Sequence, residues 1–167
     1  LVAFADRADL RPSVFGHLGD FAGSSDEDRR FNAVYYLARN FRDIDQTHSI
    51  LRTIATSENS KKVWSEAVWS LVNYYTDPYA LTVCEKVAKA ATDTGSFARA
   101  LVFVEFFPSP LSLRTMQNIE QSLPQGYYRD FVSSDIADYR PSTIYSQKLP
   151  VISLVDSLKS YTHQVAA

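Results

Sequence analysis

The sequence predicts an all-α fold: an α-α superhelix, or solenoid, of about three antiparallel helix pairs with a flanking helix at each end. The first observation behind this prediction is an internal repeat. The hexapeptide at residues 32–37 (NAVYYL) returns 34 residues later at 66–71 (EAVWSL), and a third copy at 99–104 (RALVFV) follows after 33 more. A repeat of this period is typical of helical units that bury their apolar faces by stacking on one another.

Composition is the second observation, and it also excludes several functions. Glycine is scarce, with five residues, which fits helices joined by short connections, and 46% hydrophobic residues are enough for a sizeable core. The formal net charge of −2 argues against a binder of nucleic acid or anionic membranes, because such proteins carry a basic excess. No apolar run approaches the roughly 20 residues of a membrane span. We therefore expect neither nucleic acid nor a membrane as partner.

The first helix is expected over residues 9–21, where apolar residues recur at helical spacing. The break at residues 23–25 then separates it from the next helix. Ser24 and Glu27 have the spacing of a capping box, in which the two side chains satisfy free N–H groups at a helix start. This second helix is expected to run to about Arg42.

Either Asp43 or Asp45 is expected to cap the third helix, which ends at a polar turn over residues 57–60. The second and third helix pairs are expected at residues 61–75, 78–91, 96–107 and 110–123.

The same hinge sequence occurs in two consecutive units. Asp77-Pro78 and Ser109-Pro110 each place a capping side chain before a proline at the first helical position, where a missing N–H costs little. This recurrence at equivalent points supports paired antiparallel helices. The chain is then expected to form a short helix at 127–136, an irregular connection at 137–149 and a final helix at 150–163.

The whole chain, residues 1–167, is interpreted as a single helical-repeat domain. Because it opens on Leu1 rather than Met, we interpret it as a piece of a longer protein. The units and the C-terminal extension are expected at residues 26–58, 60–93, 96–123 and 124–167.

These units resemble HEAT-like and armadillo-type helical repeats in two features. The first helices share an Ala-Val-aromatic-x-Leu pattern at residues 33–37 and 67–71, and polar hinges occur at Asp43, Asp77 and Ser109. Tetratricopeptide repeats match less well, since their pattern has a glycine after the leucine of the first helix. The resemblance implies an architecture in which the second helices line a concave side, where partners commonly dock.

Residues with catalytic or metal-binding chemistry are scattered along the chain. His17, His48 and His163 lack the spacing of a zinc site, and His48 takes the position of a repeat leucine, which favours a partly buried structural role. Cys84 falls on an apolar helix face and is interpreted as a core thiol. As the lone cysteine it forms no internal disulfide, which fits a cytoplasmic location. We therefore expect no metal and no cofactor.

Asp135 and Asp138 lie three residues apart near a helix end, a spacing that suits an acid–base pair or a cation site. Because the sequence supplies no further groups for such a site, solvated acids at the end of a helix are the preferred interpretation. We therefore assign no catalytic residue.

A stripe of aromatic residues follows the first helices of the units and is interpreted as filling the layers between helices rather than forming a groove. Its members are Tyr35, Tyr36, Trp69, Tyr74, Tyr75, Phe103, Phe106 and Phe107. Binding residues are instead expected on the polar face of the second helices. These candidates are Arg52, Lys86, Lys89, Arg114, Gln117 and Asn118.

The leading functional hypothesis is a non-catalytic scaffold or protein-interaction module. Its partner would be another protein or another domain of the same chain. The alternative is a helical, armadillo-like accessory domain at the C-terminal end of a larger enzyme, such as a peptidase, where it shapes substrate access. A third hypothesis, an autonomous hydrolase using Asp135 and Asp138, requires a pocket that converges on both carboxylates.

Overall fold

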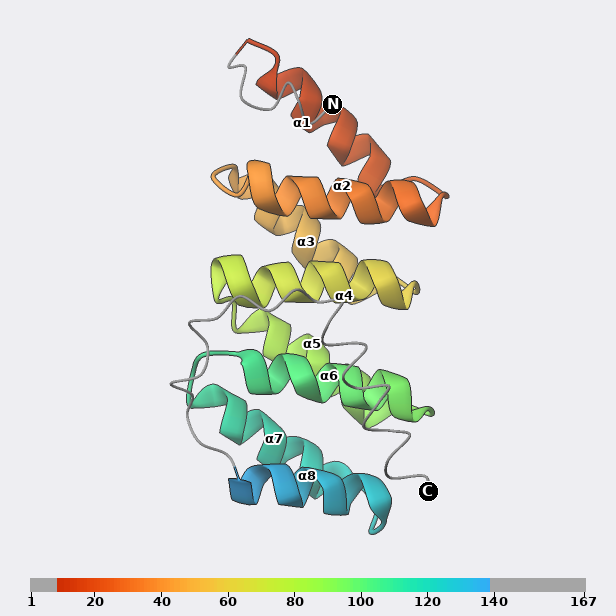
Figure 1. Cartoon of the computed structure of the whole chain (residues 1–167), viewed down its shortest axis with the longest axis vertical. Helices are drawn as coiled ribbons and strands as arrows, with labels where there is room; N and C mark the ends of the chain where they lie inside the picture. The colour runs from red at the N-terminus through yellow and green to blue at the C-terminus, as the bar shows by residue number, and fades with distance from the viewer. Residues whose placement is uncertain (1–8, 139–167) are drawn as a thin grey trace. The chain divides into compact units, whose positions relative to one another are not determined.

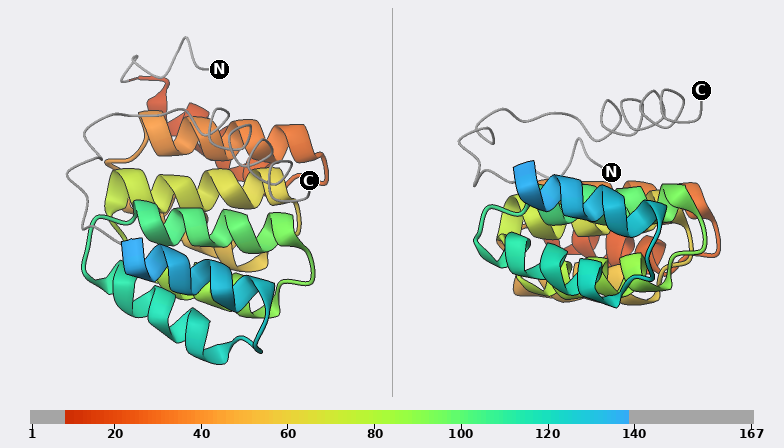
Figure 2. Two further views of the ribbon diagram at one scale, coloured as in Figure 1. Left: turned by 60° about the horizontal axis from the view of Figure 1, so that its bottom comes forward. Right: turned by 90° about the horizontal axis from the view of Figure 1, so that it is seen from below.

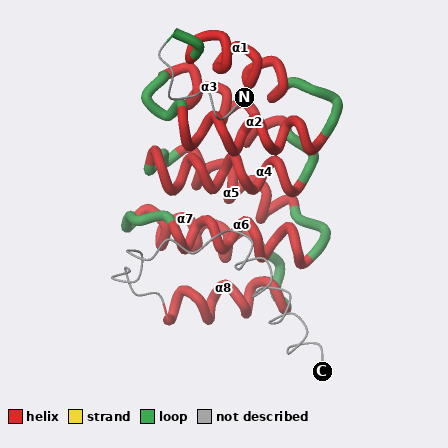
Figure 3. Tube along the Cα trace, turned by 45° about the horizontal axis from the view of Figure 1, so that its top comes forward, coloured by secondary structure: helices red, strands yellow, loops and turns green. Residues whose placement is uncertain are grey.

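The structure, a computed structural model, describes residues 9–138, and over this range the chain is helical, as predicted (Figure 1). Figure 3 shows helices and loops but no strand in the described part of the chain. The predicted helix at 150–163 and nearly all of the connection at 137–149 lie outside the described residues. In chain order the elements are α1 (Arg11–Ala22), α2 (Glu27–Asn40), α3 (Asp45–Ser57), α4 (Lys61–Ser70), the π-helical turn η2 (Leu71–Tyr75), α5 (Tyr79–Ala90), α6 (Thr94–Phe106), α7 (Leu111–Ser122) and α8 (Tyr127–Asp138).

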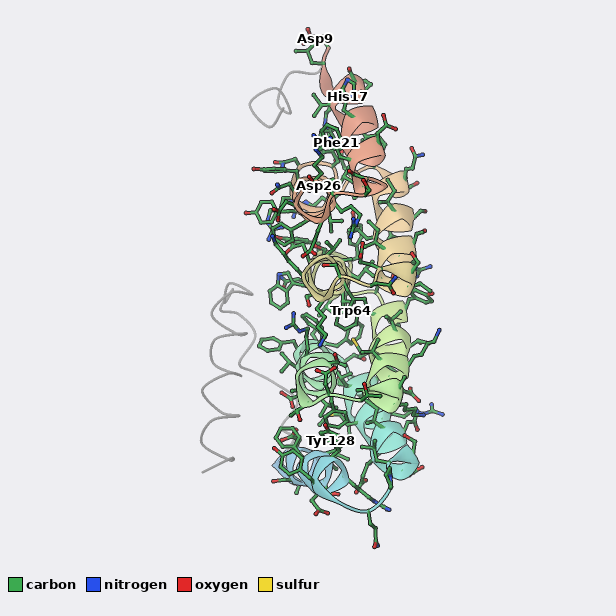
Figure 4. All side chains as sticks on the ribbon, turned by 90° about the vertical axis from the view of Figure 1, so that its right-hand side faces the viewer. Asp9, His17, Phe21, Asp26, Trp64 and Tyr128 are labelled. Carbon is green, nitrogen blue, oxygen red and sulfur yellow. The ribbon has the colours of Figure 1, made fainter. Side chains whose placement is uncertain are left out.

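The chain divides into two compact units, with the boundary between Ala80 and Leu81. In the first unit, α2 contacts α1, α3 and α4, and α3 contacts α4 and η2. Helices α2 and α4 lie side by side in one layer, and α3 lies in a second layer behind them (Figures 1 and 4). Trp64 lies between these layers, and its Nε1 donates to the carbonyl of Ala55 at 3.0 Å.

In the second unit, α7 contacts both α6 and α8. Helices α6 and α8 lie in one layer, and α7 lies in the other (Figure 2). The ring of Tyr128 on α8 packs against Phe97 on α6, with centroids 4.5 Å apart, and its hydroxyl is 3.1 Å from Thr94 Oγ1. These contacts join the two helices of the first layer directly.

Each unit has its own apolar core. Leu37 and Leu71 in the first unit and Val104 in the second have no exposed surface, which confirms that these repeat positions are buried. Cys84 is also fully buried, as expected for a core thiol, and this burial raises the thiol pKa. The second core further contains Phe97, Ala100, Leu101, Met116, Ile119 and Val132.

The predicted capping box at the start of α2 is wrong. The N-cap is Asp26, whose carboxylate accepts from the backbone N–H of Arg29 at 3.0 Å. Ser24 instead accepts from the backbone N–H of Asp26 at 3.1 Å. The reason is local: a carboxylate at Asp26 reaches the first turn directly and favours the positive end of the helix dipole, so Ser24 only shapes the preceding turn.

The predicted cap of α3 is wrong as well. Its N-cap is Ile44, without a side-chain hydrogen bond, and Asp45 is the first helical residue. Asp43 is engaged elsewhere, since its Oδ2 accepts from Arg11 Nη1 at 2.8 Å. Thr47 closes the corner by donating to the carbonyl of Phe41 at 2.7 Å.

The two hinge sequences behave alike, but the predicted caps need a correction: each helix begins one residue later than expected, and the N-cap of α7 is Pro110, without a side-chain cap hydrogen bond, rather than Ser109. Asp77 Oδ1 accepts from the backbone N–H of Tyr79 at 3.0 Å. Ser109 Oγ accepts from the backbone N–H of Leu111 at 3.2 Å. Both prolines therefore immediately precede the first residue of their helix, and the side chains before them bond to the first backbone N–H of the helix.

Candidate functional site

The most irregular backbone of the first unit lies just before α5. Helix α4 widens into the π-helical turn η2, which ends at Thr76 with φ 47° and ψ 45°, the left-handed conformation. The backbone N–H of Asp77 donates to the carbonyl of Leu71 at 3.0 Å and closes the turn. Both π-turns and left-handed β-branched residues are uncommon and cluster at functional or strained positions. The residues that follow are therefore the first candidates for a site.

We call the group His48, Arg52, Tyr75, Asp77 and Tyr79 the Asp77 corner. Asp77 is 4% exposed. Its carboxylate accepts from Arg52 Nε and Nη2 at 2.6 and 2.8 Å, and its Oδ2 lies 2.8 Å from His48 Nε2. Burial opposes ionisation, but the hydrogen bonds from Arg52, the Tyr79 backbone and His48 outweigh it and lower the Asp77 pKa to about 2.

Aromatic rings enclose the same corner. The His48 ring stacks on Tyr75, with centroids 4.7 Å apart and planes 20° from parallel. The Arg52 guanidinium lies 5.1 Å from the centroid of Tyr79. In some enzymes a buried carboxylate orients a histidine that acts as a general base. Here the carboxylate is also bidentate to Arg52, so the corner fastens α3 to the loop before α5. The expected structural role of His48 agrees with this geometry.

A second cluster ties α2 to α4 in the first unit. Glu66 is 4% exposed, and Arg39 Nη1 reaches its Oε1 at 2.6 Å. The Arg39 guanidinium lies over the ring of Tyr35, 3.5 Å from the centroid. Burial raises the Glu66 pKa despite this partner. This ion pair was not predicted from the sequence, because Arg39 and Glu66 lie 27 positions apart and only the packing of α2 on α4 brings them together.

The aromatic stripe divides into two groups. Trp69, Phe103 and Phe107 are buried and fill their cores, as interpreted from the sequence. The other five members are only partly buried: Tyr35, Tyr36, Tyr74, Tyr75 and Phe106. Among these, Tyr35 and Tyr75 serve as stacking surfaces for Arg39 and His48 rather than as core residues.

A pair of carboxyl groups lies in the second unit, where Glu105 of α6 meets Asp135 of α8. We call these two residues the carboxyl pair. Burial, the charge of Asp135 and a side-chain hydrogen bond between them raise the Glu105 pKa to about 8. The interpretation of Asp135 as a solvated helix-end acid is therefore wrong. The side chain of Asp138 lies outside the described residues. The signal for Glu105 was in the sequence: it interrupts the apolar run of residues 100–107.

The predicted binding residues belong to two units. Arg52 lies on α3 in the first unit, where Asp77 holds its guanidinium. The other five lie on α5 and α7 in the second unit and are exposed: Lys86, Lys89, Arg114, Gln117 and Asn118. Lys86 and Lys89 border a shallow depression along α5, and Lys89 Nζ pairs with Glu85 at 2.6 Å. Their role in binding remains a prediction.

Over residues 9–138, no group of three His, Cys, Asp or Glu side chains is placed to hold a metal ion. Nor does any helix of that range have the length and apolarity to cross a membrane. Comparison with protein-family models, curated proteins and solved structures finds no match for this chain. The resemblance to HEAT-like and armadillo-type repeats therefore remains a prediction from the sequence.

Proposed function

We propose that this chain is a non-catalytic helical-repeat module that binds another protein or another part of its own polypeptide. The observation that supports the proposal is that charged side chains of the first unit pair with one another across helices. In the first unit each of four arginines pairs with a carboxylate from a different element, so these charges join helices to one another. The pairs are Arg11 with Asp43, Arg30 with Glu58, Arg39 with Glu66 and Arg52 with Asp77.

The spacing of the helices supports a stack of similar pairs. Helices α2, α4, α6 and α8 begin at Glu27, Lys61, Thr94 and Tyr127, so their starts are 34, 33 and 33 residues apart. A constant period of this length is typical of solenoids, in which each pair is covered by its neighbours. We therefore propose an α-α superhelix of antiparallel pairs, with α8 as the first helix of a fourth pair.

The proposed docking surface is the polar side of α5 and α7. Lys86 and Arg114 give it a positive charge, Lys89 lies there in an ion pair with Glu85, and Gln117 and Asn118 add hydrogen-bonding groups. Exposed charges at the edge of an interface raise the rate of association with an oppositely charged partner more than they add to affinity. An acidic segment of a protein is the partner that this surface suits best.

The test is a double charge reversal, Lys86→Glu with Arg114→Glu. Peptides are first selected from a displayed random library on the wild-type chain, and their affinities are then measured by fluorescence polarisation. We expect the selected peptides to be acidic and to bind the double variant at least about tenfold more weakly. The melting temperature should change little, because exposed charges contribute little to stability.

A matched control reverses two exposed charges in the first unit, Arg42→Glu with Lys61→Glu. This variant should bind the same peptides as well as the wild type does. The docking surface would be refuted if the control lost binding and the Lys86/Arg114 variant kept it. Selection of no peptide above background by the folded chain would count against the binding module itself.

A further inference from the structure

The Asp77 corner leaves part of the Arg52 side chain facing solvent. Asp77 is buried, whereas the side chain of Arg52 is 46% exposed. A guanidinium group has five N–H donors. Asp77 accepts one from Nε and one from Nη2, and the remaining three make no hydrogen bond within residues 9–138. Arg52 therefore has one edge that is occupied by Asp77 and one edge that is open.

The open edge of Arg52 has the shape of a fork. Because the guanidinium group is planar, an N–H of Nη1 and the outer N–H of Nη2 point in parallel away from Asp77. Two parallel N–H groups match the two oxygens of a carboxylate, a geometry that lysine does not offer. The two edges use different N–H groups, so a second carboxylate can bind without displacing Asp77.

The guanidinium group is held in place by its neighbours in the first unit. Asp77 fixes the Nε edge, and the guanidinium carbon lies 5.1 Å from the ring centroid of Tyr79. The Tyr79 hydroxyl lies 2.9 Å from Thr56 Oγ1, which also donates to the backbone carbonyl of Arg52 at 2.8 Å. A side chain that is ordered in advance loses little conformational entropy on binding. The open edge is therefore preorganised.

The charges around the fork suit a ligand with a single negative charge. Asp77 offsets the charge of Arg52, and its oxygens are already engaged by Arg52, His48 and the backbone N–H of Tyr79. Residues 48–56 contain no acidic side chain, so this part of α3 places no like charge beside the fork. A phosphate group carries up to two negative charges at neutral pH and would require a further cation.

We propose that the open edge of Arg52 is a recognition site for the side-chain carboxylate of an aspartate or glutamate in a partner protein. The carboxylate oxygens accept from Nη1 and Nη2, while Asp77 and Tyr79 position the guanidinium group. This site rests on the proposed protein-binding function but not on the docking surface of α5 and α7, because Arg52 belongs to the first unit. Chain ends are commonly captured by backbone N–H groups, and those of Asp77 and Tyr79 already donate within the first unit.

The experiment adds the capped peptide Ac-Ala-Glu-Ala-NH2 to the full chain carrying Lys86→Glu with Arg114→Glu, and follows the backbone and arginine Nε–H signals by NMR. This background removes the charge of the docking surface, so failure of that surface and failure of the Arg52 site are measured separately. We expect saturable shifts at Arg52, Thr56 and Tyr79, with half-saturation in the millimolar range, as befits a single exposed ion pair. The neutral peptide Ac-Ala-Gln-Ala-NH2 should give no saturable shift there.

Arg52→Lys, made in the same background, keeps a positive charge opposite Asp77 but loses the fork. Its shifts should not saturate over the same range of peptide concentration. Arg29→Lys, at another exposed arginine of the first unit, is the matched control and should bind as the parent does. Melting temperatures show that both variants are folded, and the titration of the parent chain tests the site without either of them.

Three outcomes would overturn this assignment. The first is the absence of a saturable shift at Arg52 with the glutamate peptide, and the second is an equal response to the glutamine peptide. Undiminished binding by folded Arg52→Lys is the third, because it would show that charge alone attracts the peptide. A stronger response to Ac-Ala-Ala-Ala, whose carboxylate is at its chain end, would overturn the choice of an acidic side chain as the ligand.

Discussion

At the scale of single residues, arginine is the group that makes buried carboxylates tolerable in the first unit. A buried ion pair is costly to form, and removing one partner leaves an uncompensated charge that destabilises by about 3–5 kcal/mol. Glu66 and Asp77, both almost fully buried, each receive a guanidinium that also stacks on a tyrosine ring. The planar fork of arginine allows both contacts at once, which lysine cannot reproduce.

Asp77 gives a prediction for acid stability. Its pKa is lowered from 3.8 to about 2 in the folded chain, so it contributes stability above its ordinary pKa that is lost as the pH falls through about 2. A shift of this size corresponds to about 2 kcal/mol at neutral pH. Asp77→Asn should lower the melting temperature at pH 6 and flatten its decline between pH 4 and pH 2. A decline as steep as that of the wild type would show that other carboxylates dominate acid unfolding.

At the scale of elements, the end of η2 departs most from regular helix. Thr76 takes the left-handed position that glycine usually occupies after a helix, and the backbone N–H of Asp77 donates to the carbonyl of Leu71, one residue further back than in a Schellman motif. For a β-branched residue this conformation is unfavourable by about 1–2 kcal/mol. The turn therefore stores strain beside the Asp77 corner.

This strain leads to a prediction of stabilisation. Thr76→Gly should raise the free energy of unfolding by about 0.5–1 kcal/mol, because relief of the left-handed conformation exceeds the extra entropy of glycine in the unfolded chain. Asn73→Gly, within η2, is the control and should destabilise by about 1 kcal/mol. Urea unfolding measures both changes. Equal losses in the two variants would show that the Thr76 conformation carries no strain.

Periodicity predicted the helices well, because an apolar face repeats along the sequence and depends on no distant partner. The breaks near residues 77 and 109 followed from side chains that cap locally. The start of α3 was missed because Asp43 has a better partner in Arg11, 32 residues away. The turn η2 was missed because a widened turn leaves Leu71 buried and its apolar spacing intact.

The candidate sites were harder to predict than the helices. Glu105 and Asp135 lie 30 residues apart, and only the packing of α8 beside α6 brings them together. Asp77 was recognised as a capping residue, but its contacts with His48 and Arg52 come from a neighbouring helix. Sequence patterns report contacts within a helix or turn, whereas these sites consist of contacts between helices.

At the scale of the whole molecule, stability should be distributed between two units. Each unit has its own buried apolar core, so a local defect in one core should have mostly local effects. Leu37 in the first unit and Leu101 in the second are equally well buried leucines and offer a matched pair of truncations.

Leu37→Ala and Leu101→Ala should each cost about 2–5 kcal/mol, through lost transfer free energy and a residual cavity. Hydrogen exchange should become faster mainly over α1–α4 in Leu37→Ala and mainly over α6–α8 in Leu101→Ala. Equal acceleration across the whole chain in either variant would instead indicate a single cooperative unit.

Because Cys84 is buried, the rate of its alkylation can measure how often the second unit opens. It is the only cysteine of the 167 residues, and its thiol is shielded within the second unit. Alkylating reagents attack the thiolate, so modification requires a conformation that uncovers α5 and restores an ordinary acidity. The rate at which intact chains gain one adduct mass therefore counts spontaneous openings of this unit, in plain buffer and without any introduced label.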